Sequence, residues 1–294
     1  MNHWTGVAGK RVIITGATSG IGLAAAKELA RLGAELTIIA RAPRRADDAV
    51  AQIRAGAPSA APVDVLIADV ASQADLRRVA AEILQRYGRV QVLINNAGAI
   101  YTRRRFSPDG IELTWAVNHL APFLLSSLLF ERLGSSAPAR VVTTASAAHR
   151  PARIPFGDLQ AERAYPGLGY VRYGETKLAN ILFTAELARR LEGTGVAANC
   201  FHPGFVASAF NLNNGGLMRL GMRIGRLFAR SPERGAETLV WLADSAEVAN
   251  VSGGYFLDKR LERPSRAAQD VDAARRLWQI SEASLARARP SGEQ

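Results

Sequence analysis

Short apolar runs alternate with longer amphipathic stretches along most of the chain. The runs are rich in valine, isoleucine and other strand-favouring residues and are bounded by turn residues, which predicts buried β-strands. The predicted strands cover residues 10–15, 35–40, 63–67, 90–94, 139–145, 196–201 and 254–257. The stretches between them have apolar positions at helical spacing. They predict helices at residues 23–32, 47–55, 74–87, 111–133 and 170–191, and near 271–286.

This alternation predicts an α/β fold with a doubly wound parallel sheet of the Rossmann type. In such a sheet, ligands bind beyond the carboxyl ends of the strands. The 294 residues contain no internal repeat and no linker that would separate a second domain. We therefore expect one domain over residues 1–294.

A glycine-rich turn joins the first predicted strand to the first helix, with Gly16, Gly20 and Gly22 as its glycines. Gly16 permits a tight turn, Gly20 lets the backbone approach a phosphate, and Gly22 lets the helix pack closely on the strand. The helix N-terminus would present free N–H groups to a pyrophosphate. A plain turn is the alternative, because the spacing is not Gly-x-Gly-x-x-Gly. The flanking strand and helix favour dinucleotide binding.

The second predicted strand ends at Ala40 and Arg41, where an acidic residue would bind the ribose 2′-hydroxyl of NAD. An arginine there accommodates a 2′-phosphate, so the sequence favours NADP(H) over NAD(H). Arg44 and Arg45 follow closely. They could contribute to the same site or simply begin a solvated helix.

Polar and small residues also follow the third and fourth predicted strands. Asp69, followed by Val70, is placed to accept from an adenine amino group, or alternatively to cap the next helix together with Ser72. The adjacent asparagines at 95 and 96 predict bonds to neighbouring strands that keep a cleft open. Ala97 and Gly98 are small enough to let an adenosine ribose approach.

Tyr173 and Lys177 are four residues apart, so in a helix they share one face. A cation beside a phenol lowers the pKa of the phenol, and a tyrosine tuned in this way can transfer a proton. By itself, this spacing is also common on ordinary helix surfaces. Asn118 lies inside the predicted helix over residues 111–133. Asparagine is a mediocre residue for a helix interior, so it invites a packing or functional reason.

Composition narrows the classes of function. The formal net charge of +11 suits an anionic partner, although arginine is spread along the whole chain and much of the excess is typical of solvated surface. The sequence has no zinc-ligand spacing, so no metal site is expected, and no aromatic-studded basic groove, which argues against nucleic acid. The single cysteine, Cys200, fits a reducing cytoplasm and a buried structural thiol. No apolar run is long enough for a transmembrane segment, and no signal peptide is recognisable.

Over residues 8–260 the chain resembles a short-chain dehydrogenase/reductase, and within that family the retinol dehydrogenase-like group. The resemblance rests on the glycine turn, on Asn95-Asn96-Ala97-Gly98, and on the order and spacing of Asn118, Ser146, Tyr173-x-x-x-Lys177 and Pro203-Gly204. Segments typical of the group include Asn118-His119-Leu120, Ala148-His149 and Lys177-Leu178-Ala179-Asn180. Thr176 replaces the serine that usually precedes the lysine but keeps the hydroxyl.

The resemblance implies a role for each matching residue. Tyr173 would exchange a proton with the substrate oxygen, Ser146 would orient that oxygen, and Lys177 would tune the tyrosine and bind the nicotinamide ribose. Asn118 would hold a water that links Lys177 to solvent. The cofactor would contact the following residues: Gly16, Thr18, Ser19, Gly20, Ile21, Gly22, Arg41, Asp69, Val70, Asn96, Ala97, Gly98, Thr144, Tyr173, Lys177, Pro203, Gly204, Val206 and Ser208.

Residues 208–230 are expected to form a lid with apolar and arginine-rich faces. The lid could be a mobile flap over a hydrophobic substrate, a basic helix that touches an anionic membrane, or an ordinary surface helix. The extension over residues 261–294 has no function that the sequence reveals. The resemblance also implies a homodimer or homotetramer through the helices at 111–133 and 170–191.

The sequence therefore predicts an NADP(H)-dependent oxidoreductase acting on an apolar aldehyde, ketone or alcohol. The alternative is a catalytically silent NADP-binding regulator or scaffold of the same fold, which the presence of Ser146, Tyr173, Lys177 and Asn118 disfavours. The further hypothesis, that the protein binds nucleic acid, rests on the net charge alone.

Overall fold

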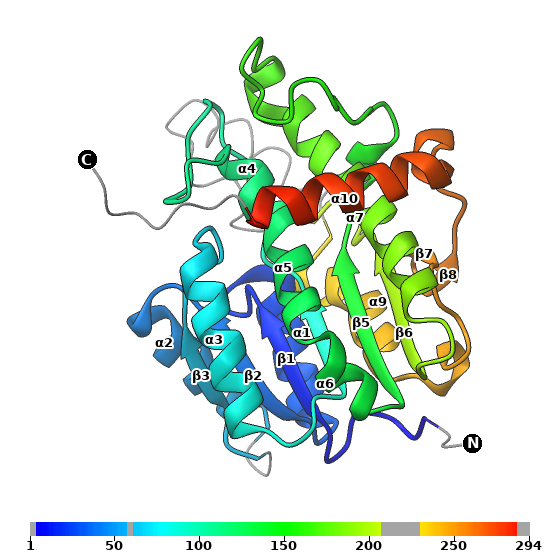
Figure 1. Ribbon diagram of the computed structural model, residues 1–294. Coiled ribbons are helices and arrows are strands. Elements are labelled where there is room, and N and C mark those ends of the chain that lie inside the picture. The colour runs from blue at the N-terminus through cyan, green and yellow to red at the C-terminus, as the bar shows by residue number, and fades with distance from the viewer. Residues whose placement is uncertain (1–3, 58–60, 207–229, 287–294) are drawn as a thin grey trace.

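The chain forms an eight-stranded sheet with the strand order β3-β2-β1-β4-β5-β6-β7-β8 (Figure 1). The computed structural model describes residues 4–57, 61–206 and 230–286. The strands are β1 (Arg11–Thr15), β2 (Glu35–Ala40), β3 (Asp64–Ile67), β4 (Val92–Asn95), β5 (Ala139–Thr144), β6 (Val196–Phe201), β7 (Tyr255–Leu257) and β8 (Arg260–Leu261). The neighbours from β3 to β7 pair in parallel, and β8 pairs with β7 in the antiparallel direction.

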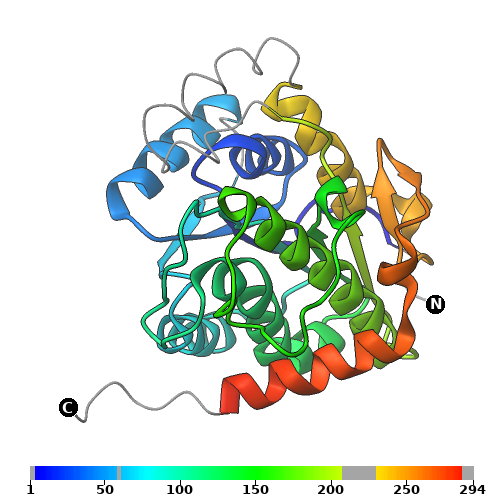
Figure 2. The same ribbon diagram turned by 90° about the horizontal axis from the view of Figure 1, so that it is seen from above.

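Helices cover both faces of this sheet, as Figures 1 and 2 show. One layer holds α1 (Gly20–Arg31), α2 (Pro43–Gly56) and α9 (Pro232–Asp244). The other holds α3 (Gln73–Arg86), α5 (Ala121–Leu128), α6 (Phe130–Ser135) and α7 (Tyr170–Arg190). Successive strand residues serve opposite layers: Ile13 belongs to the core under α3, α5 and α7, and Ile14 to the core under α1 and α9. The predicted doubly wound α/β fold is confirmed.

The predicted helix over residues 111–133 is not one regular helix. It consists of α4 (Leu113–Trp115), a π-helical segment η1 (Ala116–Leu120), α5 and α6. Asn118 lies in the π segment, where hydrogen bonds run to the fifth residue instead of the fourth. Helix α9 and strand β8 were not predicted. Helix α2 begins at Pro43, before the predicted start at residue 47, because proline suits the first turn of a helix.

The C-terminal helix α10 (Val271–Ala286) is formed as predicted and packs along α7 (Figures 1 and 2). The Trp278 ring stacks on Phe183 at a centroid distance of 6.0 Å and meets Phe123 edge-on at 4.7 Å. The guanidinium of Arg190 lies 4.2 Å from the centre of the Trp278 ring. A helix of the same chain thus covers part of the face that the family resemblance predicts as a subunit interface. The oligomeric state stays a prediction.

Within the described ranges, no helix is both long and apolar enough to cross a membrane. The predicted lid over residues 208–230 lies outside the described residues except for Arg230. Cys200 is buried on β6, and burial raises the pKa of its thiol to about 12, which suits a structural thiol.

Candidate active site

The polar residues that follow the predicted strands lie at one edge of the sheet. Strands β1 to β6 are parallel, so their carboxyl ends point the same way. The residues at this edge that belong to the predicted site are Gly16, Arg41, Asn96, Thr144, Ser146 and Pro203. The topology thus brings together segments far apart in the sequence, at the edge where such sheets bind ligands.

The glycine turn after β1 has the backbone that the sequence predicts. Gly16 and Gly20 have φ angles of +72° and +53°, in the left-handed region that favours glycine. A Cβ atom on Gly22 would collide with the carbonyl oxygen of Gly16 and the side chain of Asn96. Gly22 therefore lets α1 pack closely on the turn.

The N-terminus of α1 fits an anionic group. Ser19 at the N-cap makes no side-chain capping bond, and the first turn, which includes Ile21, holds no acidic residue. The first N–H groups of a helix have no intrahelical acceptor and form the positive end of its dipole. A pyrophosphate would satisfy them. Thr18, in the turn itself, is partly buried.

Asn96 ties the glycine turn to the ends of two neighbouring strands. Its Nδ2 donates to the carbonyl oxygens of Thr15 and Gly16, both at 3.3 Å, and its Oδ1 accepts from the Thr144 hydroxyl, also at 3.3 Å. The Thr15 hydroxyl accepts in return from the N–H groups of Asn96 and Ala97 at 3.0 Å. The prediction that the asparagines join neighbouring strands is right for Asn96.

Asn95 departs from that prediction, because its Nδ2 donates to Ser126 on α5 at 3.0 Å. Gly98, two residues after Asn96, is partly buried. Ala97 and Gly98 follow the end of β4, and their small size leaves space at this edge of the sheet.

Arg41 directly follows β2 and is exposed. It is close enough to Tyr101 to oppose the rise in the pKa of that phenol, which burial causes in the first place. Arg44 and Arg45 are exposed in the first turn of α2. This placement fits both a phosphate-binding and a solvated role for Arg44 and Arg45.

The alternative interpretation, a helix cap shared by Asp69 and Ser72, is wrong for Asp69 and right for Ser72. The Oδ1 of Asp69 accepts from the N–H of Ala71 at 3.0 Å in a tight turn. The capping residue is Ser72, whose hydroxyl accepts from Asp75 at 3.2 Å. Val70 is partly buried and packs against the core under α3.

The hydroxyl of Ser146 lies close enough to the phenol of Tyr173 to lower the pKa of that phenol, against the larger rise that burial causes. Tyr173 lies in the first turn of α7, and Ser146 caps the short helix Ala147–His149 by accepting from Ala148 at 3.2 Å. A Cβ atom on Gly174 would lie 2.7 Å from the Ala148 carbonyl oxygen. Gly174 therefore lets α7 approach the serine loop, a role that was not predicted from the sequence. A glycine inside a predicted helix beside the tyrosine was the available signal.

Lys177 is 2% exposed, and its Nζ donates to the carbonyl oxygen of Thr144 at 2.8 Å. The ammonium lies 5.5 Å from the centre of the Tyr173 ring. Burial lowers the pKa of Lys177 to about 7, because no carboxylate of the described residues pairs with it.

The predicted lowering of the tyrosine pKa is wrong for this structure. Burial raises the pKa of Tyr173 to about 12, and the nearby hydroxyl of Ser146 only partly opposes that rise. A lysine that is itself desolvated supplies little positive charge to its neighbour near neutral pH. The tyrosine is therefore protonated.

The side chain of Asn118 joins the π segment to two other parts of the site. Its Oδ1 accepts from the N–H of Ala99 at 2.8 Å, and its Nδ2 donates to the carbonyl of Ala99 at 2.8 Å and to the hydroxyl of Thr176 at 3.0 Å. The Thr176 hydroxyl donates to the carbonyl of Tyr173 at 2.7 Å. The threonine in the usual serine position thus connects Asn118 to the turn that carries the tyrosine.

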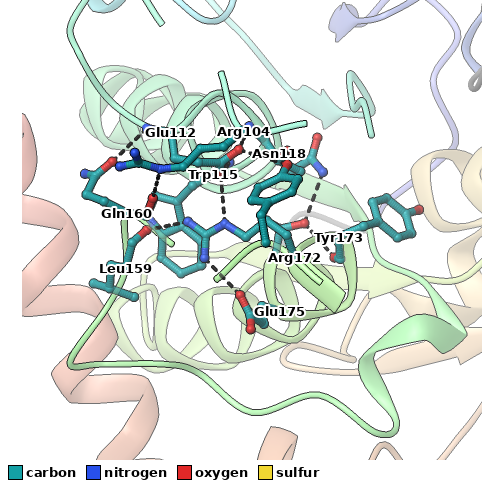
Figure 3. A network of polar contacts seen from close by, with 12 residues as sticks. Arg104, Glu112, Trp115, Asn118, Leu159, Gln160, Arg172, Tyr173 and Glu175 are labelled. Carbon is teal, nitrogen blue, oxygen red and sulfur yellow. Dashed lines mark hydrogen bonds and ion pairs between the residues drawn. The ribbon is translucent and has the colours of Figure 1, made fainter. Parts of the chain in front are cut away.

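A buried polar network lies next to these residues (Figure 3). Glu112 is fully buried; it caps α4 by accepting from Thr114 and Trp115, and it pairs with Arg172 at 2.7 Å. Arg172 also pairs with Glu175 at 3.0 Å and donates to the carbonyl of Leu159. Tyr173, the next residue, points away from this network (Figure 3). The sequence did not predict this network, since isolated charges in a sequence do not reveal their partners.

The loop after β6 lies beside α1 and α9. Gly204 has a φ angle of +79°, and a Cβ atom there would lie 2.8 Å from the Arg230 side chain. Val206 forms a single bridge with Arg230 and packs close to Gly235 of α9. Pro203 is partly buried. Ser208 lies outside the described residues.

Comparison with known proteins agrees with this geometry. A family model described as short chain dehydrogenase matches residues 10–158. Human retinol dehydrogenase 14 is 42% identical over 293 residues, which cover 93% of this chain and 85% of the relative. A crystal structure of an uncharacterized protein from Mycobacterium paratuberculosis has a TM-score of 0.77 and 30% identity over 98% of this chain and all of that chain. A short-chain dehydrogenase from Burkholderia cenocepacia in complex with NADP has a TM-score of 0.67 and 25% identity over 90% of this chain and 99% of that chain.

Proposed function

The chain belongs to the short-chain dehydrogenase family, within its retinol dehydrogenase-like group, and from that premise we propose that it is an NADP(H)-dependent oxidoreductase. The proposed reaction transfers a hydride between the nicotinamide and the carbonyl or alcohol carbon of an apolar aldehyde, ketone or alcohol. The retinol dehydrogenases among its relatives are named for an apolar alcohol, which supports this class of substrate.

The observation that carries the proposal is that the Tyr173 phenol lies beside the Ser146 hydroxyl and the buried Lys177 ammonium at the carboxyl edge of the sheet. A carbonyl oxygen near both hydroxyls could accept from each. The serine would hold the oxygen in place while the tyrosine gives its proton. Because burial raises the pKa of Tyr173 to about 12, the phenol is in the protonated form that reduction of a carbonyl requires.

Lys177 and Asn118 would support that proton transfer. The cofactor supplies the hydride, and the protein supplies position and charge. By family resemblance, Lys177 binds the nicotinamide ribose hydroxyls, and its pKa of about 7 lets it gain or lose a proton near neutral pH. Both amide N–H groups of Asn118 are used by Ala99 and Thr176. A relay water would therefore bind at a backbone carbonyl of the π segment, where the bonding pattern changes.

The preference for NADP(H) rests on Arg41. Its exposed guanidinium directly follows β2, where no acidic residue competes with a phosphate. The relative from Burkholderia cenocepacia with NADP bound supports the same cofactor. The glycine turn and the uncapped N-terminus of α1 fit the pyrophosphate.

The test is the oxidation of NADPH and NADH, measured side by side with a panel of apolar aldehydes and ketones. We expect NADPH to be preferred, and we expect Arg41→Asp to lower kcat/KM for NADPH about 10- to 100-fold, since a charge-assisted bond is lost. Arg54→Asp makes the same charge change in the last turn of α2 and should have no effect. A preference for NADH would contradict the role of Arg41. Tight NADPH binding without turnover on any carbonyl would instead favour the silent regulator or scaffold.

A further inference from the structure

The chain after β8 returns to the back of the proposed active site. Residues 262–286 pass through the short helix Arg266–Gln269 into α10. They meet two segments that carry proposed catalytic residues, the loop after β5 and the π segment η1. Each contact is made to a histidine that lies close in sequence to a proposed catalytic residue.

The first contact reaches Ser146 through His149. The backbone N–H of Ser265 donates to His149 Nε2 at 3.1 Å, so Nε2 carries no proton. The proton of the neutral ring is then on Nδ1, which lies 2.7 Å from the carbonyl oxygen of Ser146 and donates to it. The imidazole therefore links residue 265 to the serine that lies beside the Tyr173 phenol.

The second contact reaches the π segment through His119, the residue after Asn118. The Ser281 hydroxyl donates to the carbonyl of Leu277 in its own helix at 2.8 Å. Its oxygen is then the acceptor for His119 Nε2–H, also at 2.8 Å. The ring of His119 is held between Trp115, at a centroid distance of 4.7 Å, and Phe123, at 6.2 Å.

Both rings are suited to hold fixed positions. They are fully buried, and burial lowers the pKa of His119 to about 3 and also lowers that of His149. Neutral imidazoles keep one donor and one acceptor nitrogen, so each bridge has a defined direction. Ser146 and the π segment each have one such link to the C-terminal segment.

We propose that residues 262–286 act as a brace that positions Ser146 through His149 and Asn118 through His119. This inference rests on the proposed function, since it assumes that Ser146 and Asn118 serve the reaction. His149, His119 and Ser281 are positioning residues that act through the residues they hold. The brace gives the C-terminal extension a function that the sequence alone did not reveal.

Two serines of α10 provide a matched test of the brace at Asn118. Ser281 and Ser284 both donate to the carbonyl four residues earlier at 2.8 Å, but only Ser281 accepts from a histidine. We expect Ser281→Ala to lower kcat about tenfold, because small displacements of catalytic groups are costly. The KM for NADPH should stay within about twofold of the parent, since cofactor contacts are unchanged. Equal kcat values for Ser281→Ala and Ser284→Ala would overturn this half of the proposal.

Two variants of His149 separate the effect of its bond to Ser146 from the effect of its bond to Ser265. Asparagine places an N–H near the position of Nδ1, so His149→Asn keeps the bond to Ser146 and loses the bond to Ser265. Glutamine reaches the position of Nε2, so His149→Gln keeps the bond to Ser265 and loses the bond to Ser146. We expect both to lower kcat about tenfold at an unchanged KM for NADPH. Parental kcat in His149→Asn would show that only the local bond matters and would overturn the brace at Ser146.

Hydrogen exchange provides a measurement that needs no turnover. Backbone amides of residues 116–120 should exchange faster in Ser281→Ala, and those of residues 146–149 faster in His149→Asn, with Ser284→Ala like the parent. Unchanged exchange in the first two variants would overturn the brace. If exchange changes while the parent itself turns over no carbonyl with NADPH, the proposed function fails and the brace remains as a link of the fold.

Discussion

Arg172 and Lys177 are two buried cations on α7 in opposite surroundings. Arg172 is 2% exposed and lies between two carboxylates, Glu112 at 2.7 Å and Glu175 at 3.0 Å (Figure 3). Lys177 is equally buried, but its ammonium donates to the carbonyl oxygen of Thr144 and has no carboxylate of the described residues as a partner. The same helix thus buries one charge with compensation and one without it.

The difference in surroundings gives the two cations different roles, structural for Arg172 and chemical for Lys177. A compensated buried charge holds elements together, and here it ties α7 to α4 and to the segment around Leu159. The protonation of an uncompensated buried cation depends on what binds beside it. For Lys177, burial lowers the pKa to about 7. Perturbed groups of this kind cluster at functional sites. The protein therefore places a rigid ion pair directly before its proposed proton donor and a responsive lysine one turn after it.

The largest expected effect is on catalytic activity. It distinguishes Tyr173, which lies beside Lys177, from Tyr165, which belongs to the network around Arg172. Burial raises the pKa of both Tyr173 and Tyr165 to about 12. Only Tyr173 lies beside Ser146, whereas Tyr165 bonds Glu112 at 3.2 Å and Thr114 at 2.9 Å in the structural network. Tyr173→Phe should lower kcat/KM about 10³- to 10⁴-fold, since the proton donor is lost. Carbonyl-dependent NADPH oxidation measures this, with Tyr165→Phe as the control. Parental rates in Tyr173→Phe would refute the mechanism.

The next effect concerns the compensated cation and is read as stability. Arg172→Met leaves Glu112 buried without its partner, which should lower the free energy of unfolding by about 3–5 kcal/mol in urea titrations. Adding Glu112→Gln should recover part of that loss, because the unpaired charge disappears. Arg31→Met, which breaks an exposed pair with Glu28, should change little. If the two changes at the buried pair simply add, the two charges are not coupled and the contrast with Lys177 disappears.

A pH titration tests the uncompensated cation. The pKa of Lys177 falls from 10.5 in the unfolded chain to about 7 in the fold, so between these values the unfolded state binds more protons. Stability from this group is therefore lowest below pH 7 and rises as pH increases toward 10. In protein free of cofactor, the parent should gain about 1 kcal/mol per pH unit between pH 7.5 and 8.5 relative to Lys177→Met. Parallel curves for the two proteins would show that the lysine is not desolvated.

The last prediction concerns the Thr176 hydroxyl, which joins the two regions. Thr176→Val removes the acceptor of Asn118 and the donor to the Tyr173 carbonyl, which should cost about 1–2 kcal/mol of stability. Thr176→Ser keeps the hydroxyl and should remain close to the parent. Thermal unfolding of both variants measures the difference. If valine and serine behave alike, the hydroxyl does not link Asn118 to α7.

Local patterns in the sequence were enough to predict the sheet and much of its edge. Apolar runs and helical spacing predicted strands β1 to β7, because these signals depend on neighbours in the chain. The glycines at 16, 20 and 22 predicted a tight turn with close packing of the following helix, and Gly16 and Gly20 have positive φ angles. The Tyr-x-x-x-Lys spacing placed both side chains on α7, although whether they act in catalysis stays a prediction.

Contacts between distant residues decided the rest. Glu112 and Arg172 are separated by 60 positions, and nothing around either residue distinguishes it from a surface charge. The π segment at Asn118, the approach of α7 to the serine loop at Gly174 and the packing of α10 depend on the same assembled layers. The tyrosine pKa was mispredicted because spacing identifies a neighbouring ammonium but not its burial, and burial lowers the pKa of the lysine and raises that of the phenol. The chain itself thus specified which groups are present and in what order, and only the fold determined which charges have partners, because desolvation depends on the whole tertiary structure.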